Sequence, residues 1–388
     1  MYESHMFEVT AARRPEVAQA VNIRGLERLF RRQRIDCLIC RSGINTVYLS
    51  GISSPGTLGR HLDLADTPRE TFVVWPASGE PVVVVSEIAS EVARVSSHIA
   101  RIKTYADYVE SPERALANVV RDLNLATARI GFDQAWFGAS RWSELLLMLP
   151  EMEPVDCTAE LDLVRAVKTP IEVEELRRAA VLLDQAFLDV FPTVRAGQTE
   201  RQVNARICST ALELGAGSIH GILQASSNPV LYGGESECRL AAEDLVRTDY
   251  VTYLNGYAAN LSRLLHVGPP SPESQRIYRS YLAIYQEAVA LLRSGAVGGE
   301  VHNSIRALFE SNGWTSGPPI SGHGVGVWFH QQYPLLVPGS SDVLEPGMVV
   351  AIEPISGHWH LQDEYLITDG DPVRLSDRFD LEELAWTR

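Results

Sequence analysis

Two acid–base side chains stand out in the last third of the 388-residue chain because of the backbone around them. His323 lies between Gly322 and Gly324, in a turn where a substrate can approach the main chain closely. Glu353 directly follows the β-branched, apolar run 348–352, which is typical of a buried strand. A carboxylate at the end of such a strand is costly to bury unless it has a partner or a task. We therefore expect His323 and Glu353 to be the catalytic pair, with the imidazole as a proton shuttle.

Two domains are expected to position these residues. In residues 1–160, helix and strand patterns alternate, which is typical of an α/β domain. Here we expect a helix over 16–33 and strands over 35–39 and 45–51. Residues 161–388 predict helices beside a largely antiparallel sheet, an α+β arrangement. Helix-start signals, either proline in the first turn or a capping box, occur at 169–170, 199–202 and 271–272.

Composition excludes several functional classes. The formal net charge of −15 argues against nucleic-acid binding and against docking on anionic membranes, both of which need basic surface. No apolar run approaches the roughly 18 residues of a membrane span. Residues 1–15 lack the pattern of a secretion signal, and five scattered cysteines are typical of buried, reduced thiols. We expect a cytoplasmic protein with a small-molecule substrate.

A series of motifs follows in a recognisable order along the C-terminal domain. It comprises Arg165-Ala-Val-Lys168-Thr-Pro-Ile-Glu172, Gly197-Gln-Thr-Glu200, Gly322-His323-Gly324, Glu345-Pro-Gly-Met348 and Glu353-Pro354. This order resembles the creatinase/aminopeptidase P superfamily, and the N-terminal domain is similar in length and style. The resemblance implies a pita-bread C-terminal domain behind a smaller creatinase N-terminal-like α/β domain. By the same analogy it implies a homodimer.

The resemblance also implies a metal site that this chain has altered. Peptidases of this fold hold two metal ions with two aspartates, a histidine and two glutamates; the histidine corresponds to His323 and the first glutamate to Glu353. The other positions correspond to Asn260, to Gln362 and to the vicinity of Asn255, where amides replace acids. Neutral amide oxygens are weak donors for Mg²⁺, Mn²⁺ or Fe²⁺. We therefore expect no metal and no other cofactor.

Creatinases keep the same fold and cleave a C–N bond without metal, because a guanidinium or amidinium carbon is already electrophilic. Their catalytic histidine has no counterpart here, since Tyr232 occupies that place. We expect a metal-independent hydrolase of an amidine, cyclic amidine or amide in a small nitrogenous molecule. The residues expected to bind the substrate are polar or aromatic and lie near the motifs: Tyr232, Asn255, Tyr257, Asn260, Arg263, His330, Gln362 and Glu364.

Three alternatives remain open. The chain could be an Xaa-Pro-type metallopeptidase, if the correspondence drawn around Asn255 or Gln362 is wrong. It could be a lyase, cyclase or isomerase in which the same pair moves protons without water. It could also be a catalytically inactive protein that binds peptides or partner proteins, as some members of the superfamily do.

Overall fold

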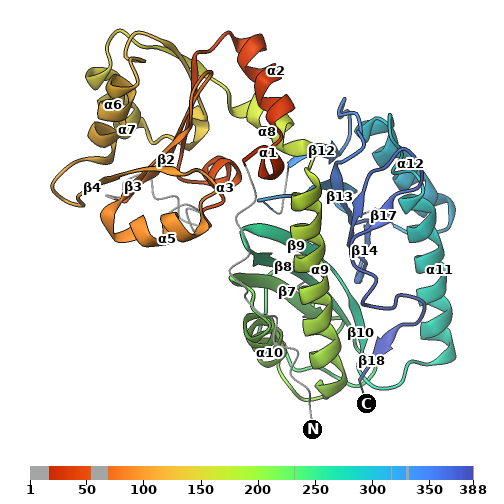
Figure 1. Cartoon of the computed structure of the whole chain (residues 1–388). Helices are drawn as coiled ribbons and strands as arrows, with labels where there is room; N and C mark the ends of the chain where they lie inside the picture. Colours follow the sequence, from red (N-terminus) through yellow and green to blue (C-terminus); the bar gives the residue numbers. More distant parts are fainter. Residues whose placement is uncertain (1–16, 54–68, 231, 316, 329–331, 388) are drawn as a thin grey trace. The chain divides into compact units, whose positions relative to one another are not determined.

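The structure of the chain is a computed structural model that describes residues 17–53, 69–230, 232–315, 317–328 and 332–387 (Figure 1). The chain divides into two compact units, one ending at Thr158 and the other beginning at Ala159. The first is an α/β domain and the second an α+β domain, as expected. Within the described ranges, no helix is both long and apolar enough to cross a membrane.

The first unit contains a six-stranded sheet in the order β4-β3-β2-β1-β5-β6. β1 pairs antiparallel with β2 and parallel with β5, so the sheet is mixed. Its elements are α1 (Val17–Ala20), α2 (Ile23–Gln33), β1 (Cys37–Arg41), α3 (Ile44–Ser50), β2 (Thr71–Pro76), β3 (Val82–Ser86), η1 (Glu87–Ala89), α5 (Ser90–Ser96), β4 (Arg101–Tyr105), α6 (Pro112–Asp122), β5 (Arg129–Phe132), η2 (Gln134–Trp136), α7 (Ala139–Met148) and β6 (Glu153–Asp156).

The strand expected over 45–51 is instead the helix α3. Its seven residues are all buried, and it ends where Gly51 adopts a left-handed conformation with φ 78°. The amide of Asn45 donates to Asp133 Oδ2 at 3.1 Å, across 88 residues of sequence. The apolar, β-branched composition therefore reflected burial, and tertiary contacts decided the backbone conformation. The expected helix over 16–33 is likewise divided into α1 and α2 in its described part.

In the second unit, helices begin where capping signals predicted them. Thr169 and Thr199 each form a capping box, at the start of α9 and α10, and Ser271 caps α11. The helices are α8 (Thr158–Ala166), α9 (Pro170–Val190), η3 (Phe191–Thr193), α10 (Glu200–Glu213), α11 (Pro272–Val289) and α12 (Gly298–Ser311). α9 lies against β8 and β9, α10 against β7, and α12 against β12 (Figure 1).

Two sheets form the framework of the second unit. One has the order β18-β10-β8-β7 with β9 paired to β8, and the other has the order β12-β11-β13-β16-β17. All pairings in them are antiparallel except β10 with β18. The strands are β7 (Ser218–Ala225), β8 (Leu245–Leu254), β9 (Tyr257–Leu261), β10 (Leu264–His266), β11 (Gly322–Gly324), β12 (Gln332–Leu336), β13 (Val349–Ile352), β14 (Ile355–Ser356), β15 (Trp359–His360), β16 (Asp363–Leu366), β17 (Val373–Arg374) and β18 (Ala385–Trp386). An isolated bridge between Ser262 and Gln362 joins the two sheets.

Candidate active site

β8 and β9 carry polar side chains on one face of their sheet. In the register of these strands Asn260 lies opposite Val251, so Asp249 is its diagonal neighbour on the same face. The side-chain amide of Asn260 donates to Asp249 Oδ1 at 3.1 Å and to the carbonyl of Tyr250 at 3.2 Å. Asn260 is thereby fixed with its N–H groups toward an acid.

The second sheet contributes the acid–base pair. His323, Ala351 and Glu364 are cross-strand partners on β11, β13 and β16, so their side chains share one face. Glu353 lies two residues beyond Ala351 and, by strand alternation, points the same way. His323 Nε2 is 3.6 Å from Glu353 Oε1, and both side chains are buried. The two residues expected to be catalytic therefore face each other.

The protonation of this pair follows from its surroundings. His323 Nδ1 lies 3.0 Å from the carbonyl of Gly324, and because a carbonyl only accepts, Nδ1 carries the proton and Nε2 the lone pair. Burial raises the pKa of Glu353 well above its usual range, and the charge of Asp249 raises it further. A carboxyl whose raised pKa favours the protonated form, beside a basic Nε2, gives the site both an acid and a base.

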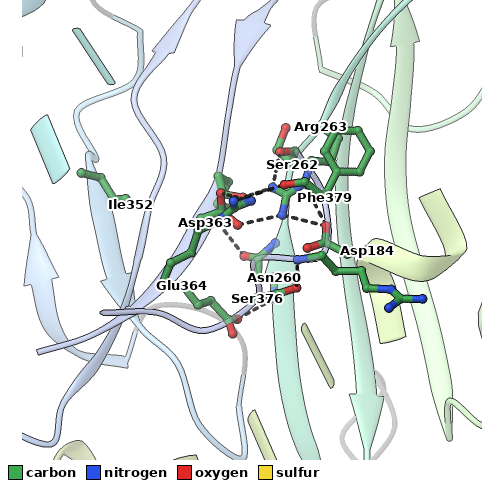
Figure 2. Close-up of polar contacts among 12 residues, drawn as sticks. Asp184, Asn260, Ser262, Arg263, Ile352, Asp363, Glu364, Ser376 and Phe379 are labelled. Atoms are coloured by element: carbon green, nitrogen blue, oxygen red, sulfur yellow. Dashed lines mark hydrogen bonds and ion pairs between the residues drawn. The ribbon is translucent and has the colours of Figure 1, made fainter. Parts of the chain in front are cut away.

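The two polar faces meet through amides. The side-chain amide of Gln362 donates to Asn260 Oδ1 at 2.9 Å, and the main-chain N–H of Asn260 donates to Glu364 Oε1 at 2.7 Å. Asn260 belongs to β9 and Glu364 to β16, and both are labelled in Figure 2. A chain of hydrogen bonds thus runs from Gln362 through Asn260 to Asp249.

Asp249 was not predicted from the sequence. The missing acid was expected near Asn255, but Asn255 is an exposed residue in the turn between β8 and β9, with φ 52°, and its amide donates to Glu175 at 2.9 Å. The expectation for Asn255 is therefore wrong. A signal was present, because an aspartate within the apolar run of β8 needs a partner. Burial also raises the pKa of Asp249, while the bond from Asn260 lowers it.

Arg263, considered both as a structural ion-pair partner and as a substrate-binding residue, has the contacts of the former. Its guanidinium is fully buried between Asp184 on α9 and Asp363 on β16, each 2.7 Å from Nη2 (Figure 2). It also donates to the carbonyls of Ser262 and Gln362. These contacts engage the guanidinium on several sides and hold the helix and both sheets together.

The other four expected substrate-binding residues differ in their surroundings. Tyr232 is 66% exposed, and its ring lies over the guanidinium of Arg247, with 5.6 Å between ring centroid and Cζ. Glu364 is buried rather than solvated, and burial raises its pKa well above its usual range. Tyr257 lies on the face of β9 opposite Asn260 and packs against the hydrophobic core, so it does not join the cluster. His330 lies outside the described residues.

The donor set does not fit a pair of divalent cations. Asn260 and Gln362 are neutral amides, and their side-chain N–H groups donate to Asp249 Oδ1 and to Asn260 Oδ1. The raised pKa of Glu353 favours its protonated form, which has to lose a proton before it can bind a cation. In the part of the chain that the structure describes, no three histidine, cysteine, aspartate or glutamate residues are grouped so that they could hold one ion.

Each of the two units matches a known protein family. Residues 174–379 match the family described as "Metallopeptidase family M24", and residues 23–167 match the "Creatinase/Prolidase N-terminal domain". An X-Pro aminopeptidase from Thermotoga maritima superposes with a TM-score of 0.77 at 18% identity, over 95% of this chain and 99% of that one. That likeness concerns the fold alone.

Similar sequences carry peptidase names. "Uncharacterized peptidase YqhT" of Bacillus subtilis is 26% identical over 353 residues, covering 89% of this chain and 94% of that protein. An Xaa-Pro dipeptidase of Lactobacillus helveticus is 32% identical over 209 residues, covering 51% of this chain and 55% of its own.

Proposed function

The chain belongs to metallopeptidase family M24, and we propose that it hydrolyses a C–N bond of a small nitrogenous molecule through His323 and Glu353, without a pair of metal ions. One observation carries this proposal: Asn260 and Gln362 are neutral amides rather than acids, and their N–H groups donate to Asp249 and to Asn260 Oδ1. The negative charge that would neutralise two adjacent cations is replaced by hydrogen-bond donors.

The chemistry proceeds with the groups that remain. A guanidinium or amidinium carbon needs no Lewis acid, because it is already polarised by its positive charge. Asp249 provides negative charge for this cation. His323 Nε2 takes a proton from water as the water oxygen bonds to the carbon, and protonated Glu353 gives its proton to the nitrogen that leaves. One C–O bond forms and one C–N bond breaks; the proton that His323 gains comes from the water, and the proton that the leaving nitrogen gains comes from Glu353.

A second candidate function is hydrolysis of an Xaa-Pro dipeptide. Several relatives are named Xaa-Pro dipeptidases, among them those of Lactobacillus helveticus and Pyrococcus furiosus. These names support a peptide substrate better than an amidine, whereas the amides in the site support chemistry without paired metals. The two candidates therefore differ in their requirement for metal as well as in their substrate.

Turnover measured with and without metal separates the candidates. The protein is treated with chelator and assayed against guanidino compounds, cyclic amidines and Xaa-Pro dipeptides, then assayed again after addition of Mn²⁺. We expect activity that chelator leaves unchanged and that Glu353→Gln and His323→Ala abolish. Glu345→Gln is the matched control, because it removes an exposed carboxylate from the turn before β13. Turnover of Xaa-Pro dipeptides only after metal is added would refute the proposal and support the dipeptidase.

A further inference from the structure

An arginine lies on the same face of β8 as Asp249. Arg247 and Asp249 are two residues apart on the strand, so their side chains point to the same side. Arg247 is only 3% exposed, and its Nη2 donates to Gln224 Oε1 at 2.7 Å. Gln224 is its cross-strand partner on β7. A buried positive charge is costly, and here it lies beside the cluster that carries the acid–base pair.

Gln224 connects this arginine to the segment that carries Tyr232. Its side-chain nitrogen donates to the carbonyl of Val230 at 2.6 Å while its oxygen accepts from Arg247. The ring of Tyr232 then covers the guanidinium. Burial raises the pKa of the Tyr232 phenol, and the charge of Asp249 raises it further.

Two imidazoles complete the surroundings of Arg247. His360 belongs to β15, which packs against β8, and its side chain is wholly buried. Among the residues that the structure describes, neither ring nitrogen of His360 has a hydrogen-bond partner, and neither has Nδ1 of His358. Burial and the charge of Arg247 lower the pKa of His360 to about 3. His360 is thus a neutral ring, and its N–H has a donor capacity that the protein leaves unused.

We propose that Arg247, together with His360 and beneath Tyr232, binds a carboxylate of the substrate. The cation and the unused imidazole N–H supply charge-assisted and neutral hydrogen bonds to such a group. Asp249, two residues along β8, and Glu353 suit the nitrogen-bearing end. The site would then select a small molecule with a carboxylate at one end and a cleavable C–N bond at the other. This inference rests on the proposed function for the position of the reactive bond, but its test does not require turnover.

Binding of matched compound pairs tests the carboxylate subsite. Guanidinoacetate and methylguanidine differ in the carboxylate, and so do alanyl-proline and alanyl-prolinamide. Affinities are measured by calorimetry on chelator-treated wild type and on Arg247→Met. We expect wild type to prefer the carboxylate member of at least one pair by about tenfold or more, the range of a hydrogen bond to a charged group. In Arg247→Met that preference should vanish.

Matched variants keep the outcome unambiguous. Arg247→Lys retains the charge without the planar fork and should keep part of the preference. Arg276→Met removes an exposed arginine from α11 and should leave it unchanged. If Arg247→Met does not fold, Arg247→Gln carries the test with the same expected loss. Acetate and inorganic phosphate as competitors distinguish a carboxylate ligand from a phosphorylated one.

Two results would overturn the inference: a wild type with no carboxylate preference in either pair, or a preference that survives loss of the arginine. Stronger competition by phosphate than by acetate would overturn the assignment to a carboxylate. Carboxylate-dependent binding without turnover of any compound would leave the subsite standing and refute only the proposed hydrolysis.

Discussion

Restoring the two acids should convert the site into one that requires metal to be stable. Asn260→Asp replaces the side-chain N–H donor by an oxygen. The two hydrogen bonds to Asp249 and to the carbonyl of Tyr250 are then lost, and two acceptors face each other at each place. In Gln362→Glu, the bond to residue 260 is lost in the same way. Each buried polar group left unsatisfied costs about 1–3 kcal/mol, so the three bonds together cost about 3–9 kcal/mol.

This cost is comparable to the whole free energy of unfolding of a typical domain, about 5–15 kcal/mol. We therefore expect the double variant Asn260→Asp/Gln362→Glu to be strongly destabilised in chelator. Its acids would form a carboxylate-rich set around His323, so Mn²⁺ should bind and restore about 4 kcal/mol at a thousand times its dissociation constant. The stability of wild type should change neither with chelator nor with Mn²⁺.

The assay is urea unfolding with chelator and with Mn²⁺, together with metal content by elemental analysis. Asn255→Asp is the matched control, because it makes the same change in the exposed turn between β8 and β9 and should bind no metal. The reasoning fails if untreated wild type holds two ions per chain, or if the double variant in chelator is as stable as wild type.

Two further predictions concern buried charges. A carboxyl whose pKa in the folded protein is raised above its ordinary value of 4.5 binds more protons in the folded state than in the unfolded state, so stability is lost as pH rises through the interval between the two values. Glu353→Gln abolishes this loss, and its Tm relative to wild type should therefore increase as the pH rises above 4.5; a constant difference would contradict the raised pKa. Arg263→Met should lower the free energy of unfolding by about 3–5 kcal/mol in urea, because Asp184 and Asp363 lose their buried counter-ion. Arg263→Lys, which keeps the charge, should lose less, and equal losses would show that charge is not what the cluster requires.

Local signals made much of the architecture predictable. A capping side chain accepts a hydrogen bond from a backbone N–H three residues further along the chain, so its effect is local. Thr169, Thr199 and Ser271 therefore marked helix starts correctly. The glycines around His323 and the apolar run before Glu353 act over similarly short distances, and the structure brings these two side chains together. The ordered motifs also indicated the family, and the matches over residues 174–379 and 23–167 confirm it.

Partners across sheets could not be predicted in this way. The bond from Gln362 to Asn260 spans 102 residues, and that from Arg263 to Asp363 spans 100. Such contacts depend on strand register, which is set by the packing of the whole unit and not by the residues nearby. For that reason Asp249 was missed and Asn255 was placed in the site. The sequence by itself determined the family and several helix starts, and it pointed to His323 and Glu353. Only tertiary structure decided which acids and amides lie near them, because register and sheet packing bring distant residues together.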